Sequence, residues 1–560
     1  MRFLVACGLL AAGPAVSAAQ MTAAAAYDSV QRIRAEADTL LAADPAAAVT
    51  RLHRALDFLA RPAIRDLAQG WPYLLSRAPN VWWDVAIAAT LAGDSAAALT
   101  AIERTAETGG SSIYLQWLET DSVVRRWKNH PRVQAAAAGW RRQRAMTGDS
   151  AFATGYRASL PEAERLAGLS LLWAEVRFGF PDFAIRAAVD WDSLYLAYLP
   201  QVSAAATTYD YYRTLMRFVA ALGDSHTNVY FPAAISRTMG RPPVQTTLVQ
   251  GRVIVTGTPS PTVEGLGLRV GDEIVTIDGT AVRTYAEREI APYQSAATPQ
   301  DREVRLYSYF LLQGPRDQPV RLGIRHADGS AAEVSLPRTG YRDVRPGRRP
   351  VTDSILPGNV GYLRIATFGL DSVGVWARAS MQRLIGTRAL ILDLRENDGG
   401  NTTNGPLAIL ARDSTPTTAQ RIRNYSALYR ARGLEPQPLE LGHGWIRPDP
   451  KLHYDGPVVL LIGPRTFSAG EDFAAAFDLM NRGTIVGEAS GGNTGQPLAF
   501  PLPGGGLARV RTKHDYYADG REFLFRGIQP GIVVRPTVGG VRAGRDEVLE
   551  AALSVVTTPR

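Results

Sequence analysis

The spacing of apolar residues divides the chain into regions with different expected structures. From about residue 22 to 145, apolar side chains recur every three or four positions, as at Val30, Ile33, Ala37, Leu40 and Leu41. This period places them on one face of a helix. The spacing therefore predicts a helical region that buries one side of each helix.

One stretch of this region has the pattern of a helix–turn–helix unit. The segment from Trp82 to Leu99 is apolar at helical spacing on both sides of Gly93-Asp94, and Ile102 continues the pattern. It resembles a tetratricopeptide-type (TPR-like) repeat in which Gly93-Asp94 forms the turn. Such repeats display a groove for a protein partner, whereas one or two helix pairs can also serve only as a packing cap. The sequence leaves both interpretations open.

Residues from about 150 to 230 continue the helical pattern with aromatic faces, and a histidine follows their end. The last helix stops near Gly223, and Asp224-Ser225-His226 then enters a loop before a β-branched run. Glycine at this place is typical of a helix C-terminus. A histidine in a polar turn is usually a surface hydrogen-bonding residue, but here short polar neighbours could also position it as a base.

Alternating and β-branched runs predict a small β-domain between about 243 and 338. Four runs stand out, namely 253–257, 272–279, 320–324 and 332–336. Within them, a Gly271-Asp272 turn leads into a strand that ends at Asp278-Gly279, which is a hairpin signal. This spacing resembles the PDZ-domain signature. PDZ modules bind a chain end by strand addition, while the alternative is a domain that only spaces its neighbours.

After an Arg/Pro/Gly-rich linker (345–350), alternating strand and helix patterns predict an αβ region. The run 361–368 reads as a strand, a helix extends to about Leu384, and 389–393 reads as a buried strand. That strand leads to Gly399-Gly400. Paired glycines let a backbone approach a ligand closely and turn N–H groups toward it.

A serine stands where the next buried strand changes into a helix. The run 456–463 is apolar and bounded by Gly and Pro, and an Ala/Phe-rich helical pattern begins after Ser468. A hydroxyl at a helix N-terminus lies beside unpaired N–H groups that stabilise negative charge, as a nucleophile and its oxyanion require. Ser468-x-x-Glu471 is also the pattern of a capping box, which begins many ordinary helices. These residues alone do not decide between the two.

Composition and charge exclude some functions. The chain has 560 residues and a net charge of +8, but its basic residues are almost all arginines scattered along the sequence. Scattered charge does not form the basic patch of a nucleic-acid-binding protein, so we expect no nucleic-acid partner. The first 19 residues have one arginine, a short apolar run and small residues at the end. This pattern predicts a signal peptide, an exported protein and no transmembrane span.

Cysteine chemistry is also excluded by the sequence. Cys7, the only cysteine, lies in the predicted signal peptide. The mature chain would therefore have no disulfide, thiol nucleophile or thiolate metal site. No histidine-rich zinc motif is present in the sequence, and we expect no cofactor or metal.

Taken together, the motifs resemble one family of serine peptidases, that of the C-terminal (tail-specific) processing proteases and the tricorn core protease. The resemblance covers roughly 150 to 550 and rests on 222–227, the PDZ-like run, 392–400, 468–471, 487–495 and 527–530. It implies Ser468 as the nucleophile. It also implies an oxyanion hole from the Ala469 N–H and an N–H of Gly399-Gly400.

The resemblance also implies the domain plan and fold class. We expect a multidomain α+β/αβ protein with a signal peptide (1–19), a helical TPR-like region (20–148) and a helical part of the protease region (149–240). A PDZ-like domain (241–340) and a crotonase/ClpP-like αβ catalytic domain (350–560) follow.

Within the family, the base distinguishes two branches. Processing proteases use a lysine in a Gly-Lys-Gly sequence, whereas this chain has Asn493-Thr494 between glycines and no lysine between Lys451 and Lys513. The tricorn-like branch uses a Ser-His pair upstream, which matches Ser225-His226. It also uses an acidic residue before the Gly-Ile-x-Pro turn, for which we choose Glu522.

Two functions of different classes follow from this resemblance. The first is an exported serine peptidase that acts on peptides or unfolded proteins, with the PDZ-like domain assisting substrate capture. The second is a non-catalytic protein on the same scaffold that binds peptides or hydrophobic ligands. Retention of His226, Ser468 and the glycine pair favours the enzyme. Oligomerisation is compatible with the sequence, as is a protein partner for the helical region.

Overall fold

A computed structural model describes residues 21–70, 72–109, 113–147, 151–185, 189–258, 260–340, 349–370, 372–435 and 437–557. The predicted signal peptide and most of the linker at 345–350 lie outside these residues. The chain divides into two compact units, Met1–Gly148 and Asp149–Arg560. This division lies close to the end of the first helical region that the sequence pattern predicts.

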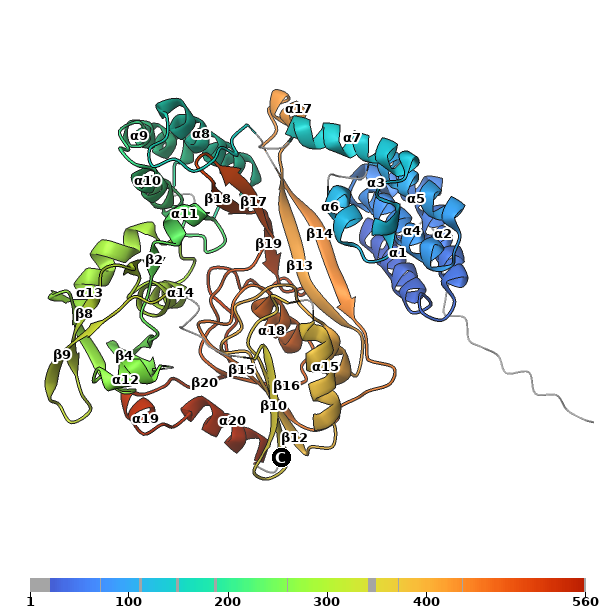
Figure 1. Cartoon of the computed structure of the whole chain (residues 1–560). Coiled ribbons are helices and arrows are strands. Elements are labelled where there is room, and N and C mark those ends of the chain that lie inside the picture. Colours follow the sequence, from blue (N-terminus) through green and yellow to red (C-terminus); the bar gives the residue numbers. More distant parts are fainter. Residues whose placement is uncertain are drawn as a thin grey trace, which may run out of the picture. The chain divides into compact units, whose positions relative to one another are not determined.

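The first unit is built from helices (Figure 1). Its longer helices are α1 (Ala23–Asp38), α2 (Pro45–Ala60), α3 (Pro62–Gly70), α4 (Ala78–Leu91), α5 (Ser95–Glu107), α6 (Ile113–Thr120) and α7 (Pro131–Thr147). The α4–α5 turn has the expected chemistry: Gly93 has φ +79°, and the Asp94 carboxylate accepts from the Ala97 N–H at 2.9 Å. Aspartate is a favoured N-cap because it satisfies a free N–H of the first turn.

The second unit begins with three helices that pack against strands from the far end of the chain. These helices are α8 (Glu162–Gly179), α9 (Trp191–Ser203) and α10 (Thr208–Ala220). After α10, β1 (Asn228–Tyr230) pairs antiparallel with β18 (Gly506–Arg511), which in turn pairs with β17 (Pro497–Leu502). Tyr211, Phe218, Phe500 and Val510 share one buried core. The loop between α10 and β1 is therefore fixed to the C-terminal region.

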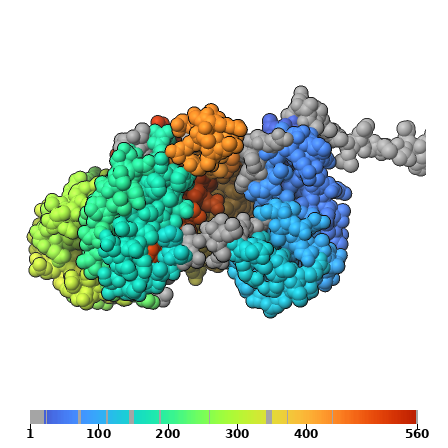
Figure 2. Space-filling model, turned by 90° about the horizontal axis from the view of Figure 1, so that it is seen from above, coloured from blue at the N-terminus to red at the C-terminus, as the bar shows by residue number. Residues whose placement is uncertain are grey.

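The chain from Gln245 to Leu336 contains a sheet with its own buried core, and we call this region the β-domain. The strand path is β3 (Gln245–Val249), β4 (Arg252–Gly257), β5 (Glu273–Ile277), β8 (Val320–Arg325) and β9 (Ala331–Leu336), with β6 (Thr280–Ala281) paired to β5. The four strands predicted from alternation correspond to β4, β5, β8 and β9. Four helical segments lie between β6 and β8, namely α13 (Val282–Tyr285), a π-helical turn (Ala286–Ile290), α14 (Pro299–Val304) and a second π-helical turn (Arg305–Tyr309). Figure 2 shows this yellow-green β-domain in contact with the teal helices α8–α10.

The C-terminal region is built on a six-stranded sheet. Its order is β10 (Val351–Leu356), β11 (Val360–Ile365), β12 (Ala389–Asp393), β15 (Val458–Ile462), β16 (Gly483–Gly487) and β20 (Ile532–Val533). All neighbours are parallel except β10 and β11. Strands β12 and β15 are buried at every position. Burial on both faces explains their continuous apolar sequences.

Helices cover both faces of this sheet. One face packs against α15 (Val373–Leu384), α16 (Gly405–Leu410) and α18 (Ala469–Leu479), and the other packs against α20 (Glu547–Thr557). Successive β12 residues alternate between the two cores, with Leu390 in the first and Ile391 in the second. The mixed helix–sheet class expected from the sequence is confirmed.

The sequence pattern did not predict a three-stranded antiparallel sheet beside the main one. Its strands are β14 (Gln437–Ile446), β13 (Thr415–Asn424) and β19 (Lys513–Tyr516). The remaining short elements are α11 (Ala233–Ser236), α12 (Pro261–Gly265), α17 (Ala427–Ala431), α19 (Val538–Arg542), β2 (Met239–Gly240) and β7 (Gly314–Pro315). Within the described residues, every helix is too short or too polar to cross a bilayer.

Two adjacent tyrosines test how α10 is attached to the C-terminal strands. Tyr212 Oη donates to the Pro503 carbonyl and accepts from the Gly506 N–H, each at 2.8 Å, and the side chain is fully buried. Tyr212→Phe leaves that N–H without its partner, so we expect unfolding to become easier by about 1–3 kcal/mol. Urea denaturation of the purified chain measures this change.

Tyr211→Phe is the matched control. Tyr211 is equally buried, but its hydroxyl has no hydrogen-bond partner among the described residues. Removing an unsatisfied buried hydroxyl should leave stability unchanged or raise it. Equal losses in both variants would contradict the role given to the Tyr212 hydrogen bonds.

Candidate active site

Ser468 stands on a strained turn between β15 and α18. Its φ of 54° and ψ of −123° are unusual for a residue with a side chain. This turn directs Ser468 toward the Gly399 loop, where a Cβ added to Gly399 would lie 3.2 Å from Ser468 Oγ. Only glycine at 399 therefore lets the two loops approach this closely. The Ser468 hydroxyl makes no N-capping hydrogen bond to α18. The Ser468 N–H donates to Glu471 Oε2 at 3.3 Å.

His226 lies beside this serine. Its Nε2 is 3.1 Å from Ser468 Oγ, although 242 residues separate the two in sequence. The imidazole stacks on the Phe467 ring, with the planes 7° apart and the centroids at 4.7 Å. The ring is 3% exposed. The structure therefore brings together the serine and the histidine that the sequence patterns singled out.

Asn493 contacts the other nitrogen of the imidazole. Asn493 Oδ1 lies 2.5 Å from His226 Nδ1, and Asn493 Nδ2 donates to Asp224 Oδ2 at 3.0 Å. The Asp224 carboxylate can only accept, so the amide NH₂ must face it and the amide oxygen must face the imidazole. His226 Nδ1 then carries the proton. Its Nε2 is left with a lone pair directed at the serine hydroxyl.

The buried Asp224 carboxylate fixes the Asn493 amide and the His226 loop by accepting hydrogen bonds from both. It accepts from the His226 N–H at 3.1 Å, from Thr227 Oγ1 at 2.9 Å and from Arg511 Nε at 2.6 Å. Burial opposes its ionisation, but Arg511 and the other donors lower the pKa of Asp224 to about 2. A permanent negative charge therefore stands one amide group away from the imidazole.

Two of the predicted site residues have other partners. The resemblance predicts that Glu522 orients the histidine, but Glu522 Oε2 lies 2.6 Å from His514 Nε2 and its Oε1 accepts from Arg421. Burial opposes a charged imidazole, but Asp182 and Glu522 together raise the pKa of His514. The position on His226 that we assigned to Glu522 is held by Asn493, which corrects that prediction.

Ser225 also faces away from the reacting atoms. Its hydroxyl donates to Asp301 Oδ2 at 2.5 Å and accepts from the Ala297 N–H at 2.8 Å. The residue is fully buried. Ser225 therefore joins the His226 loop to the β-domain and does not form part of a catalytic pair, which corrects its inclusion among the catalytic residues.

The electrostatic environment keeps His226 neutral. Burial lowers the pKa of the imidazole first, the nearby Arg509 lowers it further, and Asp224 and Asn493 only partly compensate, so the pKa falls to about 3. At neutral pH the ring is therefore uncharged and able to accept a proton. A base in this state does not need prior deprotonation.

Glu471 positions the loop that carries Asn493. Its Oε1 accepts from Ser490 Oγ at 2.5 Å and from the Gly492 N–H at 2.7 Å, and its Oε2 accepts from the Asn493 N–H at 2.9 Å. Burial raises the pKa of Glu471 to about 7 against these hydrogen bonds. The glutamate of the capping pattern thus connects the helix of the serine to the loop of the asparagine.

Two N–H groups are suited to bind an oxyanion near Ser468. In the part of the chain that the structure describes, the Ala469 and Gly400 N–H groups donate to no protein acceptor. The Gly399 N–H instead donates to Asn397 Oδ1 at 3.0 Å, so it is already used. Of the glycine pair, Gly400 remains the candidate donor beside Ala469.

Sequence reasoning missed Asn493, Asp224 and Glu471 as members of this site. Asn493 and Thr494 lie between two glycines in the segment where the processing proteases have a lysine, and this absence of lysine was the signal that could have drawn attention to Asn493. Asp224 lies only two residues before His226, and this proximity in the sequence could have suggested a role for it. Its contact with Asn493 joins loops 269 residues apart, which no local pattern reports.

Comparisons with known proteins show which family this chain resembles. Residues 359–534 match Peptidase family S41. The chloroplastic C-terminal processing peptidase of Tetradesmus obliquus is 25% identical over 62% of this chain and 73% of its own length. A putative tricorn protease homolog 2 of Streptomyces coelicolor is 24% identical over 65% of this chain and 30% of its own length.

A solved structure shows the same fold. Mature CPAF superposes with a TM-score of 0.57 at 17% identity, covering 70% of this chain and 96% of CPAF. The resemblance predicted from the sequence motifs is confirmed. These matches place residues 359–534 in peptidase family S41 and identify the chain as a serine-type peptidase.

Proposed function

We propose that the chain is an exported serine peptidase that hydrolyses peptide bonds in peptides or unfolded proteins, with Ser468 as nucleophile and His226 as general base. The observation that carries the proposal is the 3.1 Å contact between His226 Nε2 and Ser468 Oγ, with the Nδ1 proton held by Asn493. Export rests on the predicted signal peptide at 1–19. Substrate capture is assigned to the β-domain.

The first chemical step transfers the serine proton. Ser468 Oγ attacks the carbonyl carbon of the scissile bond while His226 Nε2 takes the hydroxyl proton. The carbonyl oxygen becomes an oxyanion, and the Ala469 and Gly400 N–H groups are placed to donate to it. The imidazolium is stabilised by Asn493 Oδ1 and by the Asp224 charge behind it.

The second half of the reaction releases both products. The imidazolium returns its proton to the leaving amine, the C–N bond breaks, and an acyl-enzyme remains on Ser468. Water then attacks the ester, giving its proton to His226, and collapse releases the carboxylic acid and restores the serine hydroxyl. Every proton in the cycle passes through Nε2, so the chemistry needs no metal.

Active-site labelling tests the proposed function directly. A fluorophosphonate probe phosphonylates only a serine that has an activating base, so we expect the full-length chain to be labelled at Ser468. Ser468→Ala should abolish both labelling and peptide hydrolysis. Ser335→Ala, which changes an exposed serine of β9, is the control and should behave like the unsubstituted chain. An unlabelled, folded wild-type chain would contradict the proposal.

A pair of substitutions tests which residue orients the base. Asn493→Ala removes the acceptor of the Nδ1 proton, and we expect kcat to fall by about 10²- to 10⁴-fold, as when a triad loses its orienting group. Glu522→Gln should retain kcat within about threefold, because Glu522 contacts His514 and Arg421. Steady-state kinetics and thermal unfolding of both proteins measure this. The reverse ranking, with both folded, would return the role to Glu522.

The lowered pKa of His226 predicts an unusual pH profile. Because a base is active when deprotonated, protonation of His226 should not lower kcat/KM down to about pH 5, below the midpoint near 6.5 of an unperturbed histidine, whereas protonation of Glu471, whose pKa is about 7, accounts for any limb near neutral pH. Arg509→Gln removes a cation that lowers this pKa, so its acidic limb should move to higher pH. The profile is measured with a neutral peptide. A midpoint near 6.5 that persists in Glu471→Gln would contradict the buried neutral imidazole.

A further inference from the structure

A row of charged side chains leads from the Asp224 carboxylate toward the surface. Arg511 Nε donates to Asp224 Oδ2 at 2.6 Å, and Arg511 Nη2 donates to Asp182 Oδ2. Asp182 Oδ1 lies 2.7 Å from His514 Nδ1, and His514 Nε2 lies 2.6 Å from Glu522 Oε2. Arg511, Asp182 and His514 are buried, whereas the Glu522 side chain is 36% exposed. Anions and cations alternate along these five residues, which we call the charge row.

The charge row joins segments that are far apart in the sequence. Asp182 follows α8, Arg511 is the last residue of β18, and His514 lies on β19. Asp182 is 329 residues from Arg511 and 332 residues from His514. The helices at the start of the second unit are therefore connected to its C-terminal strands through a carboxylate that shares Arg511 with Asp224.

Arg511 is held in one position by polar groups and by aromatic rings. Besides its two carboxylates, it donates from Nη1 to the Lys513 carbonyl at 3.0 Å. Its guanidinium carbon lies 5.1 Å from the centroid of the Phe180 ring and 5.3 Å from that of the Phe525 ring. A Cβ on Gly495 would come within 2.7 Å of the Arg511 side chain, so glycine leaves room for it. A planar guanidinium with fixed donors sets the direction from which it binds each carboxylate.

The position of Arg511 affects the orientation of the Asn493 amide. Asp224 Oδ2 accepts both from Arg511 Nε and from Asn493 Nδ2. Asp182 binds Arg511 Nη2, which leaves Nε for Asp224. Without Asp182, Nε and Nη2 are both available to bind the Asp224 carboxylate in the bidentate geometry that arginine favours. The guanidinium then competes with the amide for Oδ2, and the amide is no longer held with its oxygen toward His226.

His514 has its place in the charge row as an imidazolium. Each of its ring nitrogens faces a carboxylate oxygen, and a carboxylate can only accept, so both nitrogens carry protons. Burial opposes the charged ring, but Asp182 and Glu522 raise the pKa of His514. The other charged or titratable groups around the ring are Arg421, whose Nη2 lies 3.1 Å from Nε2, Arg511, which shares Asp182, and Tyr516, whose ring centroid lies 6.2 Å away.

The charge row is electrically balanced while His514 is protonated. Together with Arg421, which pairs with Glu522, it contains the anions Asp182, Asp224 and Glu522 and the cations Arg421, Arg511 and His514. Loss of the His514 proton leaves an excess of negative charge in a buried place, which is costly. Asp182 then depends on Arg511 alone and competes with Asp224 for it.

We propose that Asp182 and the His514 imidazolium are positioning residues for the reaction. They hold Arg511 in the place from which Asp224 keeps the amide oriented that fixes the tautomer of the base. Both act through Arg511 and contact none of the groups that react with the substrate. The proposal rests on the proposed peptidase function and adds two residues to its site.

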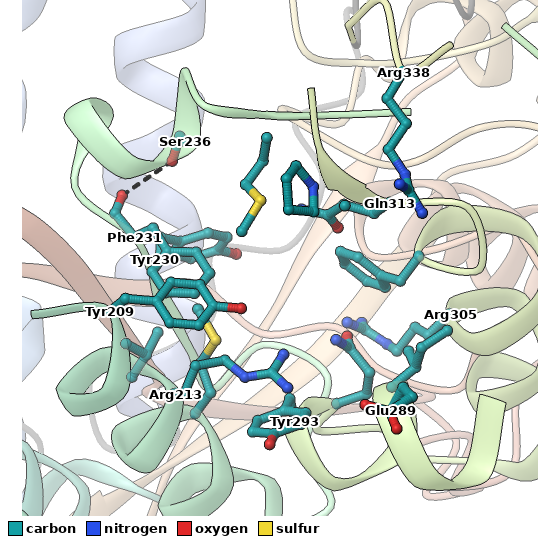
Figure 3. A pocket seen from close by; sticks show the side chains of 18 of the residues that line it. Tyr209, Arg213, Tyr230, Phe231, Ser236, Glu289, Tyr293, Arg305, Gln313 and Arg338 are labelled. Carbon is teal, nitrogen blue, oxygen red and sulfur yellow. Dashed lines mark hydrogen bonds between the residues drawn. The ribbon is translucent and has the colours of Figure 1, made fainter. Parts of the chain in front are cut away.

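The charge row is separate from the cleft beside α10 (Figure 3). This cleft has a volume of about 780 Å³ and is lined by residues of α10, β1 and the β-domain, among them Tyr209, Tyr230 and Arg305. None of the described residues that line it belongs to the charge row. Substitutions in the row leave these walls unchanged. A base that has lost its orientation lowers kcat and kcat/KM equally, so we expect their effect on kcat and not on KM.

Asp182→Asn tests the positioning role with little change of shape. It replaces the carboxylate that binds Arg511 and His514 by an amide, so we expect kcat to fall at least about tenfold and KM to stay within about twofold. The rate of fluorophosphonate labelling at Ser468 should fall by a similar factor, because labelling depends on the same base. Steady-state kinetics, labelling rates and thermal unfolding of the full-length chain measure this.

Asp192→Asn is the matched control. Asp192 belongs to the neighbouring helix α9 and pairs with Arg177 at 3.0 Å, but its side chain is 50% exposed and it lies outside the charge row. This variant should keep the kcat and the labelling rate of the unsubstituted chain.

The pH profile separates positioning from a merely structural role. Because His514 acts as an imidazolium, kcat should fall on the alkaline side of the profile as the ring loses its proton. Glu522→Gln removes one of two carboxylates that favour the charged ring, so this alkaline midpoint should move to lower pH. The limit given above for the kcat of Glu522→Gln applies below that midpoint. His514→Gln should have a reduced kcat and no such midpoint. Glu522 is partly exposed, so its variant provides the test even where Asp182→Asn and His514→Gln fail to fold.

The outcomes distinguish the charge row from the proposed function. An unchanged kcat in folded Asp182→Asn would overturn the positioning role, as would an alkaline midpoint that is absent from the wild-type chain or unmoved in Glu522→Gln. A wild-type chain that is labelled at Ser468, beside variants that behave like it, refutes the positioning role alone. An unlabelled, folded wild-type chain overturns the proposed function and the positioning role with it.

Discussion

The buried carboxylate of Asp224 is the group on which the geometry of the site depends. Its two oxygens accept from the His226 N–H, Thr227 Oγ1, Asn493 Nδ2 and Arg511 Nε. These donors come from the loop after α10, from the loop after β16 and from β18. Burying a charge is costly unless it is paired and fully hydrogen-bonded. The free energy of satisfying this one carboxylate therefore favours the assembled state of all three segments.

The same carboxylate explains how an asparagine can orient the histidine that we propose as the base. An amide is symmetric in size, and either its oxygen or its nitrogen could face the imidazole. The acceptor-only Asp224 holds the amide nitrogen, and the oxygen is then directed at Nδ1. This arrangement separates the negative charge from the imidazole by one amide. The base is thereby kept in the useful tautomer, while the ring remains neutral because burial and Arg509 lower its pKa.

Local patterns predicted much of the fold and part of the site. Buried strands such as 389–393 and 458–462, the helix after Ser468 and the glycine pair at 399–400 each have a signal within a few residues. The prediction that Glu522 orients His226 is wrong because it rests only on the distance along the sequence between Glu522 and Gly527. In the structure, Glu522 contacts His514. Asn493 was missed because its role depends on Asp224. A contact between residues 269 positions apart produces no periodic pattern of apolar residues in the sequence.

The β-domain contributes to the catalytic loops as well as to the proposed capture of substrate. Its segment 295–305 holds the His226 loop through Ser295, Ala297 and Arg305. The same segment reaches the loop of Asn493, where Thr298 Oγ1 donates to the Gly491 carbonyl at 2.7 Å.

Deleting the β-domain would therefore remove hydrogen bonds from both sides of the imidazole. Loss of activity in such a deletion could not be assigned to lost substrate binding, because the base would lose its supports at the same time. Residues 295–305 thus belong to the β-domain and also support the loops of His226 and Asn493.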